Sequence, residues 1–198
     1  MLLSYGLVRL QYEEQIYTLL PSFANIEKIG SPQEIVDIYS ILLEQKAPWY
    51  VLRLAAEKVL KACSDKELPS EMIGRATVSA WTNNLVLVKP KSGMTEYQLQ
   101  VLALHLLLHG VVGSIKFKAK KNNEAKPLKE FNISEYIESA VLALNVSYQD
   151  AANMTMTQFI SLMANKFPDH FKQKDPQGVS DDQQMAMVEY MKQNGMLN

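Results

Sequence analysis

Two short runs rich in β-branched, aromatic and aliphatic residues open the chain, at residues 6–12 and 15–20. Such runs predict β-strands, and only Glu13 and Glu14 separate them, so we predict a β-hairpin. Because Glu-Glu does not favour the tight turn of a two-residue hairpin loop, we expect a longer loop and leave the register open. Pro21 ends the second strand, and Ser22 begins a short helix that stops at Gly30.

Apolar residues spaced three and four apart then predict a block of helices. A serine, a proline and a glutamate at residues 31–34 form an N-cap and a capping box, and they start a helix over residues 32–45. We expect its buried stripe to consist of Ile35, Ile38, Tyr39, Leu42 and Leu43. Pro48 separates this helix from a second one that begins at Trp49, so the two should pack as a helical hairpin.

The next stretch has a weaker pattern, which predicts a helix through Met72, Ile73 and Ala76 and a strand at residues 85–88. Thr95 and Gln98 form another capping box. In the helix that follows, only His105 is polar over residues 101–108. A helix without a polar face is normally buried, so we expect this one to be central and to end at Gly110.

A lysine-rich segment supplies the predicted domain boundary. Residues 116–129 contain six lysines, one glutamate, one proline and few side chains to bury. We therefore divide the chain into a hairpin plus helical domain at residues 1–114, a linker at 115–130 and a helical region at 131–198. The predicted fold class is mainly helical α+β, with a last helix that begins near Ser180 and ends near Gly195.

Two short helices with a methionine-rich face dominate the third region. Ser147 with Asp150, and Thr155 with Gln158, have the spacing of helix N-caps. The partner-binding residues that we predict share one helix face or lie just before it: Met154, Met156, Phe159, Ile160 and Met163. Flexible thioethers suit a surface that binds several apolar partners. Gap-filling in an ordinary core is the competing interpretation of the same residues.

Composition and charge narrow the function classes. The chain is 47% hydrophobic and 21% charged, as in ordinary globular proteins, and its formal net charge is −1. A near-neutral chain does not attract nucleic acid as a whole, and a solvated linker explains the clustered lysines without a nucleic-acid partner. The first residues lack the basic start and long apolar run of an export signal, and no apolar run is long enough to cross a membrane. Cys63 is the single cysteine, so an internal disulfide is excluded.

Candidate catalytic chemistry is sparse. His105 and His109 are four residues apart and can point to one side of a helix, but no third metal ligand accompanies them in the sequence. The chain has no GxSxG nucleophile motif and no phosphate-binding glycine pattern. We therefore expect no metal, no cofactor and no enzymatic activity.

Two separate motifs give the chain a family resemblance. Leu19, Leu20, Pro21, Ser22 and Phe23 follow the hairpin, and an Asp150-Ala151 step precedes Met156, Thr157, Gln158 and Phe159. In both motifs the chain resembles tail assembly chaperones of long-tailed bacteriophages. The resemblance does not extend to the helical block at residues 49–113 or to the lysine-rich linker.

The resemblance implies a non-catalytic protein of the host cytoplasm. Such a protein keeps the long helical tape-measure protein soluble and helps to recruit tail-tube subunits during assembly. An adaptable methionine face would suit that partner, because a tape-measure helix exposes apolar stripes before the tube surrounds it. A structural component of the phage head or tail that stays in the virion is the alternative, and self-association is left open.

Overall fold

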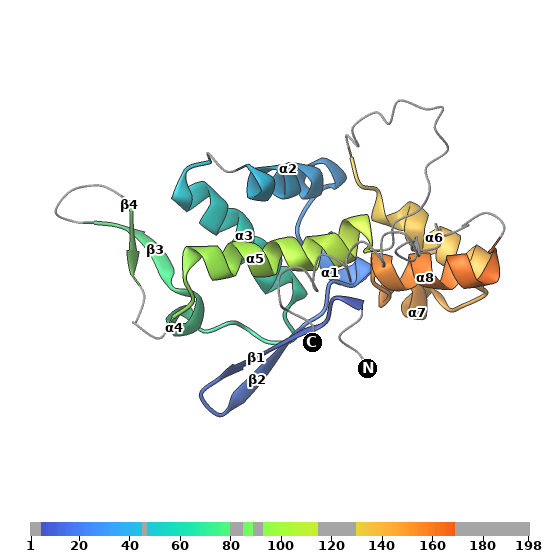
Figure 1. Ribbon diagram of the computed structural model, residues 1–198, viewed down its shortest axis with the longest axis horizontal. Helices are drawn as coiled ribbons and strands as arrows, with labels where there is room; N and C mark the ends of the chain where they lie inside the picture. Colours follow the sequence, from blue (N-terminus) through green and yellow to red (C-terminus); the bar gives the residue numbers. More distant parts are fainter. Residues whose placement is uncertain (1–4, 45–46, 80–84, 89–92, 115–129, 169–198) are drawn as a thin grey trace, which may run out of the picture.

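A computed structural model describes residues 5–44, 47–79, 85–88, 93–114 and 130–168. The fold is α+β and mainly helical, with an N-terminal two-stranded hairpin followed by helices, which confirms the predicted class (Figure 1). The predicted last helix and nearly all of the lysine-rich linker lie outside the described residues.

The hairpin pairs β1 (Val8–Tyr12) with β2 (Gln15–Leu19) in antiparallel register. Tyr12 lies opposite Gln15, so the loop consists of Glu13 and Glu14 alone. Our prediction of a longer loop is therefore wrong. Glu13 has a φ of 53°, a left-handed conformation that costs a non-glycine residue conformational energy. The pairing of β1 with β2 offsets that cost.

Three helices follow the hairpin, namely α1 (Phe23–Glu27), α2 (Pro32–Leu43) and α3 (Trp49–Cys63). The Ser31 hydroxyl accepts a hydrogen bond from the Glu34 N–H at 3.3 Å, as the predicted N-cap requires. The Glu34 carboxylate also pairs with Lys58 on α3, and this pairing lowers the pKa of Glu34. Leu43 is exposed, so the predicted buried stripe of α2 is wrong at that residue.

A short helix and a second hairpin occupy one end of the molecule: α4 (Ser70–Ile73), β3 (Arg75–Val78) and β4 (Leu85–Val88). The predicted strand at 85–88 is confirmed. The predicted helix through Ala76 is wrong, because Gly74 ends α4 with a φ of 75° and Ala76 belongs to β3. A positive φ cannot continue a right-handed helix.

The long helix α5 (Glu96–Leu107) lies across the middle of the molecule and packs against α3 (Figure 1). Thr95 and Gln98 form the predicted capping box, with bonds of 2.9 and 3.2 Å. Gly110 does not end the helix as predicted. The chain continues as a π-helical turn, η2 (Leu108–Val112), and Gly113 ends it with a φ of 81°. Gly110 instead allows a close approach, because a Cβ there would lie 2.7 Å from Cδ1 of Ile26.

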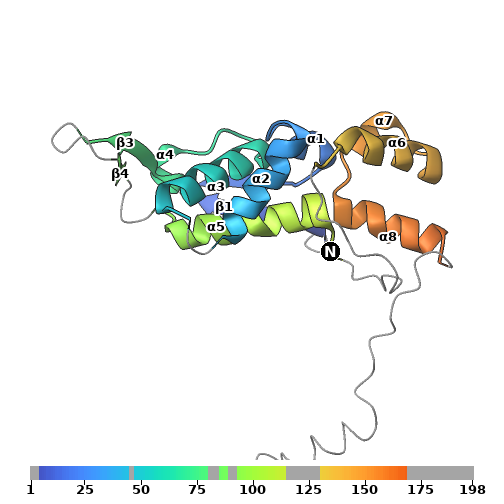
Figure 2. The same cartoon turned by 90° about the horizontal axis from the view of Figure 1, so that it is seen from above.

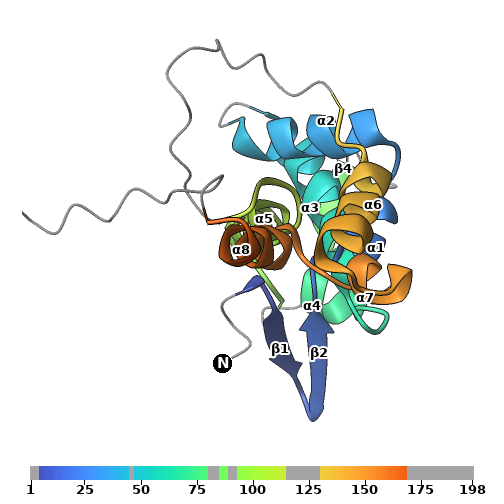
Figure 3. The ribbon, with the colours of Figure 1, turned by 90° about the vertical axis from the view of Figure 1, so that its right-hand side faces the viewer.

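The last described helices are α6 (Ile133–Leu144), α7 (Tyr148–Ala152) and α8 (Met156–Lys166). They gather at the end of the molecule opposite β3 and β4, and α8 continues the line of α5 (Figures 1 and 2). Figure 3 looks along that line, with α8 in front of α5. Buried side chains from both sides of the linker belong to one hydrophobic cluster, so the described parts of the two predicted domains share a core.

Candidate protein-binding surface

The predicted methionine face is closed within the chain. Met154, Met156 and Phe159 are 7%, 3% and 8% exposed, while Ile160 and Met163 are partly buried and pack against the core. For Met154, Met156 and Phe159, our expectation of an open surface is therefore wrong, whereas Ile160 and Met163 keep part of their surface exposed. The helical periodicity of these residues reflects their contact with the rest of this chain.

Aromatic rings from distant parts of the sequence close that face. The ring of Phe159 lies 6.1 Å from that of Phe23 on α1 and 6.2 Å from that of Tyr136 on α6, both edge to face. Phe131 stacks on Tyr136 with 5.0 Å between the ring centroids. Edge-to-face and stacked pairs add to the stability that burial alone provides. Burial, and then the nearby Glu135 carboxylate, raise the pKa of Tyr136.

A polar contact joins η2 to α8 beside this cluster. The Thr157 hydroxyl lies 2.9 Å from Nδ1 of His109 and accepts a hydrogen bond from the Ser114 N–H at 3.1 Å. Burial, and then the adjacent His105, lower the pKa of His109. The rings of His105 and His109 lie 4.6 Å apart, but no group of three or more histidine, cysteine or acidic residues among the described residues could hold a metal. His109 contributes one hydrogen bond between η2 and α8.

The exposed side of α5 carries an apolar surface that we call the outer stripe: Tyr97, Val101, Leu108 and Val112. Their spacing of four, seven and four residues places them on one side of the helix. They are 74%, 45%, 37% and 47% exposed, whereas Leu99, Ala103 and Leu106 on the opposite side are fully buried. At 1.5 Å per residue the stripe is about 22 Å long. Exposed apolar side chains along one side of a helix are a feature of protein-binding surfaces.

A groove runs beside the first half of the outer stripe. Its volume is about 360 Å³, and it lies between the hairpin and the start of α5. The lining residues are mainly apolar: Leu10, Met94, Tyr97, Gln98, Val101 and Leu102. The hairpin thus provides one wall of a surface whose other wall is α5.

Sequence reasoning missed the outer stripe, although its signal was present. Residues 101–108 lack a polar face, and this pattern predicted a central helix. The structure confirms a central position for α5, but in the described part of the chain one side of this helix stays exposed. The missing polar face therefore corresponds to the outer stripe, whose apolar side chains are exposed.

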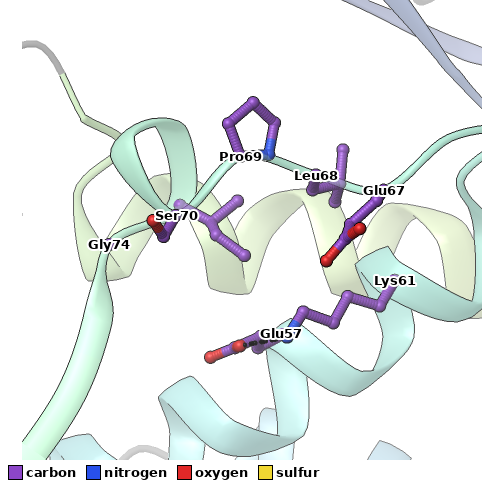
Figure 4. Close-up of a pocket in the computed structure, with 8 residues that line it drawn as sticks. Glu57, Lys61, Glu67, Leu68, Pro69, Ser70 and Gly74 are labelled. Atoms are coloured by element: carbon purple, nitrogen blue, oxygen red, sulfur yellow. Dashed lines mark ion pairs between the residues drawn. The ribbon is translucent and has the colours of Figure 1, made fainter.

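A second hollow, of about 520 Å³, is polar (Figure 4). Glu57 and Lys61 form an ion pair of 2.7 Å on α3, and they face the segment from Glu67 to Ser70. Two carboxylates and one ammonium group give this hollow a net negative lining, which does not suit phosphate groups. Near it, Arg53 is buried and donates to the Ile73 carbonyl, while its Nε and Nη1 have no hydrogen-bond partner in the described part of the chain.

Two further observations concern reactivity and membranes. Cys63 is buried, and burial raises the pKa of its thiol to about 12, so the reactive thiolate is suppressed.

Among the described residues, none of the helices combines the length and the apolar character needed to cross a membrane.

A comparison of the sequence with family models assigns this chain to a family. A model described as a family of unknown function (DUF6246) matches residues 50–186, a segment that contains the outer stripe and α6, α7 and α8. No curated protein and no solved structure matches the chain. Since the family model covers more than half of the chain, the protein belongs to the DUF6246 family.

Proposed function

We propose that this protein is a non-catalytic binding protein that holds an apolar helix of another protein, and that it acts as a phage tail assembly chaperone in the host cytoplasm. Its partners in this proposal are the tape-measure protein and the tail-tube subunits. The outer stripe of α5, and not the methionine face, is the proposed contact surface.

The exposed outer stripe is the observation that carries the proposal. Four apolar side chains are exposed along about 22 Å of one helix face, which matches four turns of a partner helix. The groove beside Leu10 and Val101 gives the partner a second wall to pack against. An amphipathic helix binds such a groove through residues spaced three and four apart.

The arrangement of the two resemblance motifs also supports the proposal. The Phe23 N–H donates to the Met154 carbonyl at 2.9 Å, and Ser22 forms an isolated antiparallel bridge with Thr155. Phe23 and Phe159 also touch edge to face. The two sequence motifs, more than a hundred residues apart, therefore form one structural unit, as expected if they belong to one ancestral pattern.

Co-expression with the tape-measure protein of the same genome tests the proposal. Val101→Asp combined with Leu108→Asp places two charges on the outer stripe, where they would have to be desolvated against an apolar helix. We expect the tape-measure protein to be soluble and to co-purify with the wild-type chain, and to precipitate with the double variant.

The matched control is Leu142→Asp combined with Tyr148→Asp. Both residues are exposed, at 84% and 62%, and both lie on the α6–α7 side of the molecule, away from the outer stripe. The control adds the same two charges and should retain full solubilising activity. Equal tape-measure solubility with the stripe variant and the control would refute the proposed contact surface.

A further inference from the structure

The spacing of the outer stripe is the same when it is read from either end. Its residues Tyr97, Val101, Leu108 and Val112 follow one another at intervals of four, seven and four residues. A surface that contacts an identical copy across a two-fold axis has to be complementary to itself. In an antiparallel pair, Tyr97 lies opposite Val112 of the second copy, and Val101 lies opposite Leu108 of the second copy. The stripe therefore matches itself over its full length.

Leu104 lies near the centre of this pattern. Its side chain is partly buried and packs against the core. With 3.6 residues per turn, Leu104 falls within about 60° of Val101 and about 40° of Leu108 around the helix axis. Intervals of four and three residues are those by which two helices pack along a shared seam. In the antiparallel pair the two-fold axis passes beside Leu104, so the leucines of both copies meet there.

Charge favours the antiparallel orientation. Residues 96–112 contain one acidic residue, Glu96, and no lysine or arginine. A parallel pair would bring the two Glu96 carboxylates together at one end. The antiparallel pair separates them by about 25 Å along the axis, beyond the screening length of about 8 Å at physiological salt. Like-charge repulsion therefore opposes only the parallel orientation.

The groove beside α5 enlarges the contact. It adjoins Tyr97 and Val101 and is also lined by Leu10 and Leu102. In the antiparallel pair the Val112 end of the second copy lies against Tyr97, next to this groove. The two-fold axis repeats the contact at the other end, so each groove borders the stripe of the other copy. A second copy of the chain has the matching spacing by its own sequence.

We propose that the outer stripe pairs with the outer stripe of a second copy, antiparallel about a two-fold axis near Leu104, so that the chain forms a homodimer in the absence of a partner. The paired stripes remove each other's apolar side chains from water. The biological role of this pairing rests on the function proposed above. A tape-measure helix has to replace the second copy before it can bind the stripe, so the apolar side chains stay shielded until that partner arrives.

Light scattering after size-exclusion chromatography of the full-length chain tests the dimer. Without any partner protein, we expect the mass of a dimer, which gives way to that of a monomer on dilution. Val101→Asp places a carboxylate opposite Leu108 of the second copy, twice in each dimer, and should raise the dissociation constant at least tenfold. The matched control is Leu142→Asp, at an exposed position on α6, which should remain a dimer. Both variants should retain the circular dichroism of the wild type, because both replaced side chains are exposed.

Disulfide formation reports the orientation. Val101→Cys and Leu108→Cys are made in separate chains, and Cys63 does not compete because it is buried and its thiol has a raised pKa. In the antiparallel pair the thiol at position 101 lies opposite the thiol at position 108, so a mixture of the two chains should form a linked dimer on oxidation. The two copies of position 101 lie about 10 Å apart along the axis, too far for a disulfide, so neither chain alone should link.

A monomer at every concentration would overturn the proposal, and so would a dimer that Val101→Asp leaves intact. Linkage of the Val101→Cys chain to itself would overturn the antiparallel arrangement. These results are distinguishable from a failure of the proposed function. A monomer that still keeps the tape-measure protein soluble would refute the dimer alone, and a stripe dimer without effect on that protein would refute the function alone.

Discussion

Met156→Ala tests whether α8 closes the core or lies open. Met156 is 3% exposed, and its Cγ lies 3.3 Å from the position of a Cβ at Gly113. Truncation of a buried methionine leaves a cavity and costs about 2–5 kcal/mol of unfolding free energy. The matched control is Leu162→Ala on the same helix, where the side chain is 37% exposed and the expected loss is below about 1 kcal/mol.

Thermal unfolding followed by far-ultraviolet circular dichroism measures the difference. For a chain of this size, 1 kcal/mol corresponds to about 2–4 °C in Tm. A loss of about 3 kcal/mol at Met156 therefore lowers Tm by about 6–12 °C, while Leu162→Ala lowers it by less than about 4 °C. The same comparison in urea should show a lower midpoint with an unchanged slope.

Equal stability of the two variants would refute this reasoning. It would mean that the Met156 side chain is not part of the packed interior in solution. The methionine face would then be open, and the original assignment of Met154, Met156, Phe159, Ile160 and Met163 as partner-binding residues would be restored.

Two other predictions concern the turn and the buried histidine. Glu13 has a φ of 53°, so Glu13→Gly should raise the unfolding free energy by about 0.5–1 kcal/mol in urea, whereas Glu14→Gly, at a position without a positive φ, should lower it. Burial lowers the pKa of His109 below its ordinary value of 6.5, so the unfolded chain binds this proton more readily and His109 destabilises the fold as pH falls through about 6.5. His109→Gln should therefore reduce the loss of urea midpoint between about pH 7.5 and about pH 5.5, and an unchanged pH dependence would contradict the assignment.

Local chemistry predicted most of the helix starts. Ser22, Ser31, Thr95, Ser147 and Thr155 all accept the backbone N–H that their spacing predicted. N-caps depend on residues within one turn, so sequence alone is sufficient to find them. The hairpin loop and the end of α5 were missed, because strand pairing and the close approach of Gly110 to Ile26 outweighed the local preferences of Glu13 and Gly110.

The candidate surface could not be chosen from periodicity. The patterns of α5 and α8 both present apolar residues at helical spacing, and nothing local decides which helix finds a cover in its own chain. Phe23 closes the face of α8 from a position more than a hundred residues earlier, whereas no described side chain covers Tyr97 to the same extent. Such pairings depend on the whole fold and not on the window in which a pattern is read.

The hydrogen bond from Phe23 to Met154 joins two segments that the ribosome makes at different times. The ribosome makes Phe23 long before it makes Met154, and at 5–20 residues per second the interval is on the order of ten seconds. Throughout that time Phe23 lacks the Met154 carbonyl and the Phe159 ring that contact it in the folded chain. The nascent chain therefore emerges with Phe23 still exposed. We expect that this apolar surface can aggregate until the later residues are made.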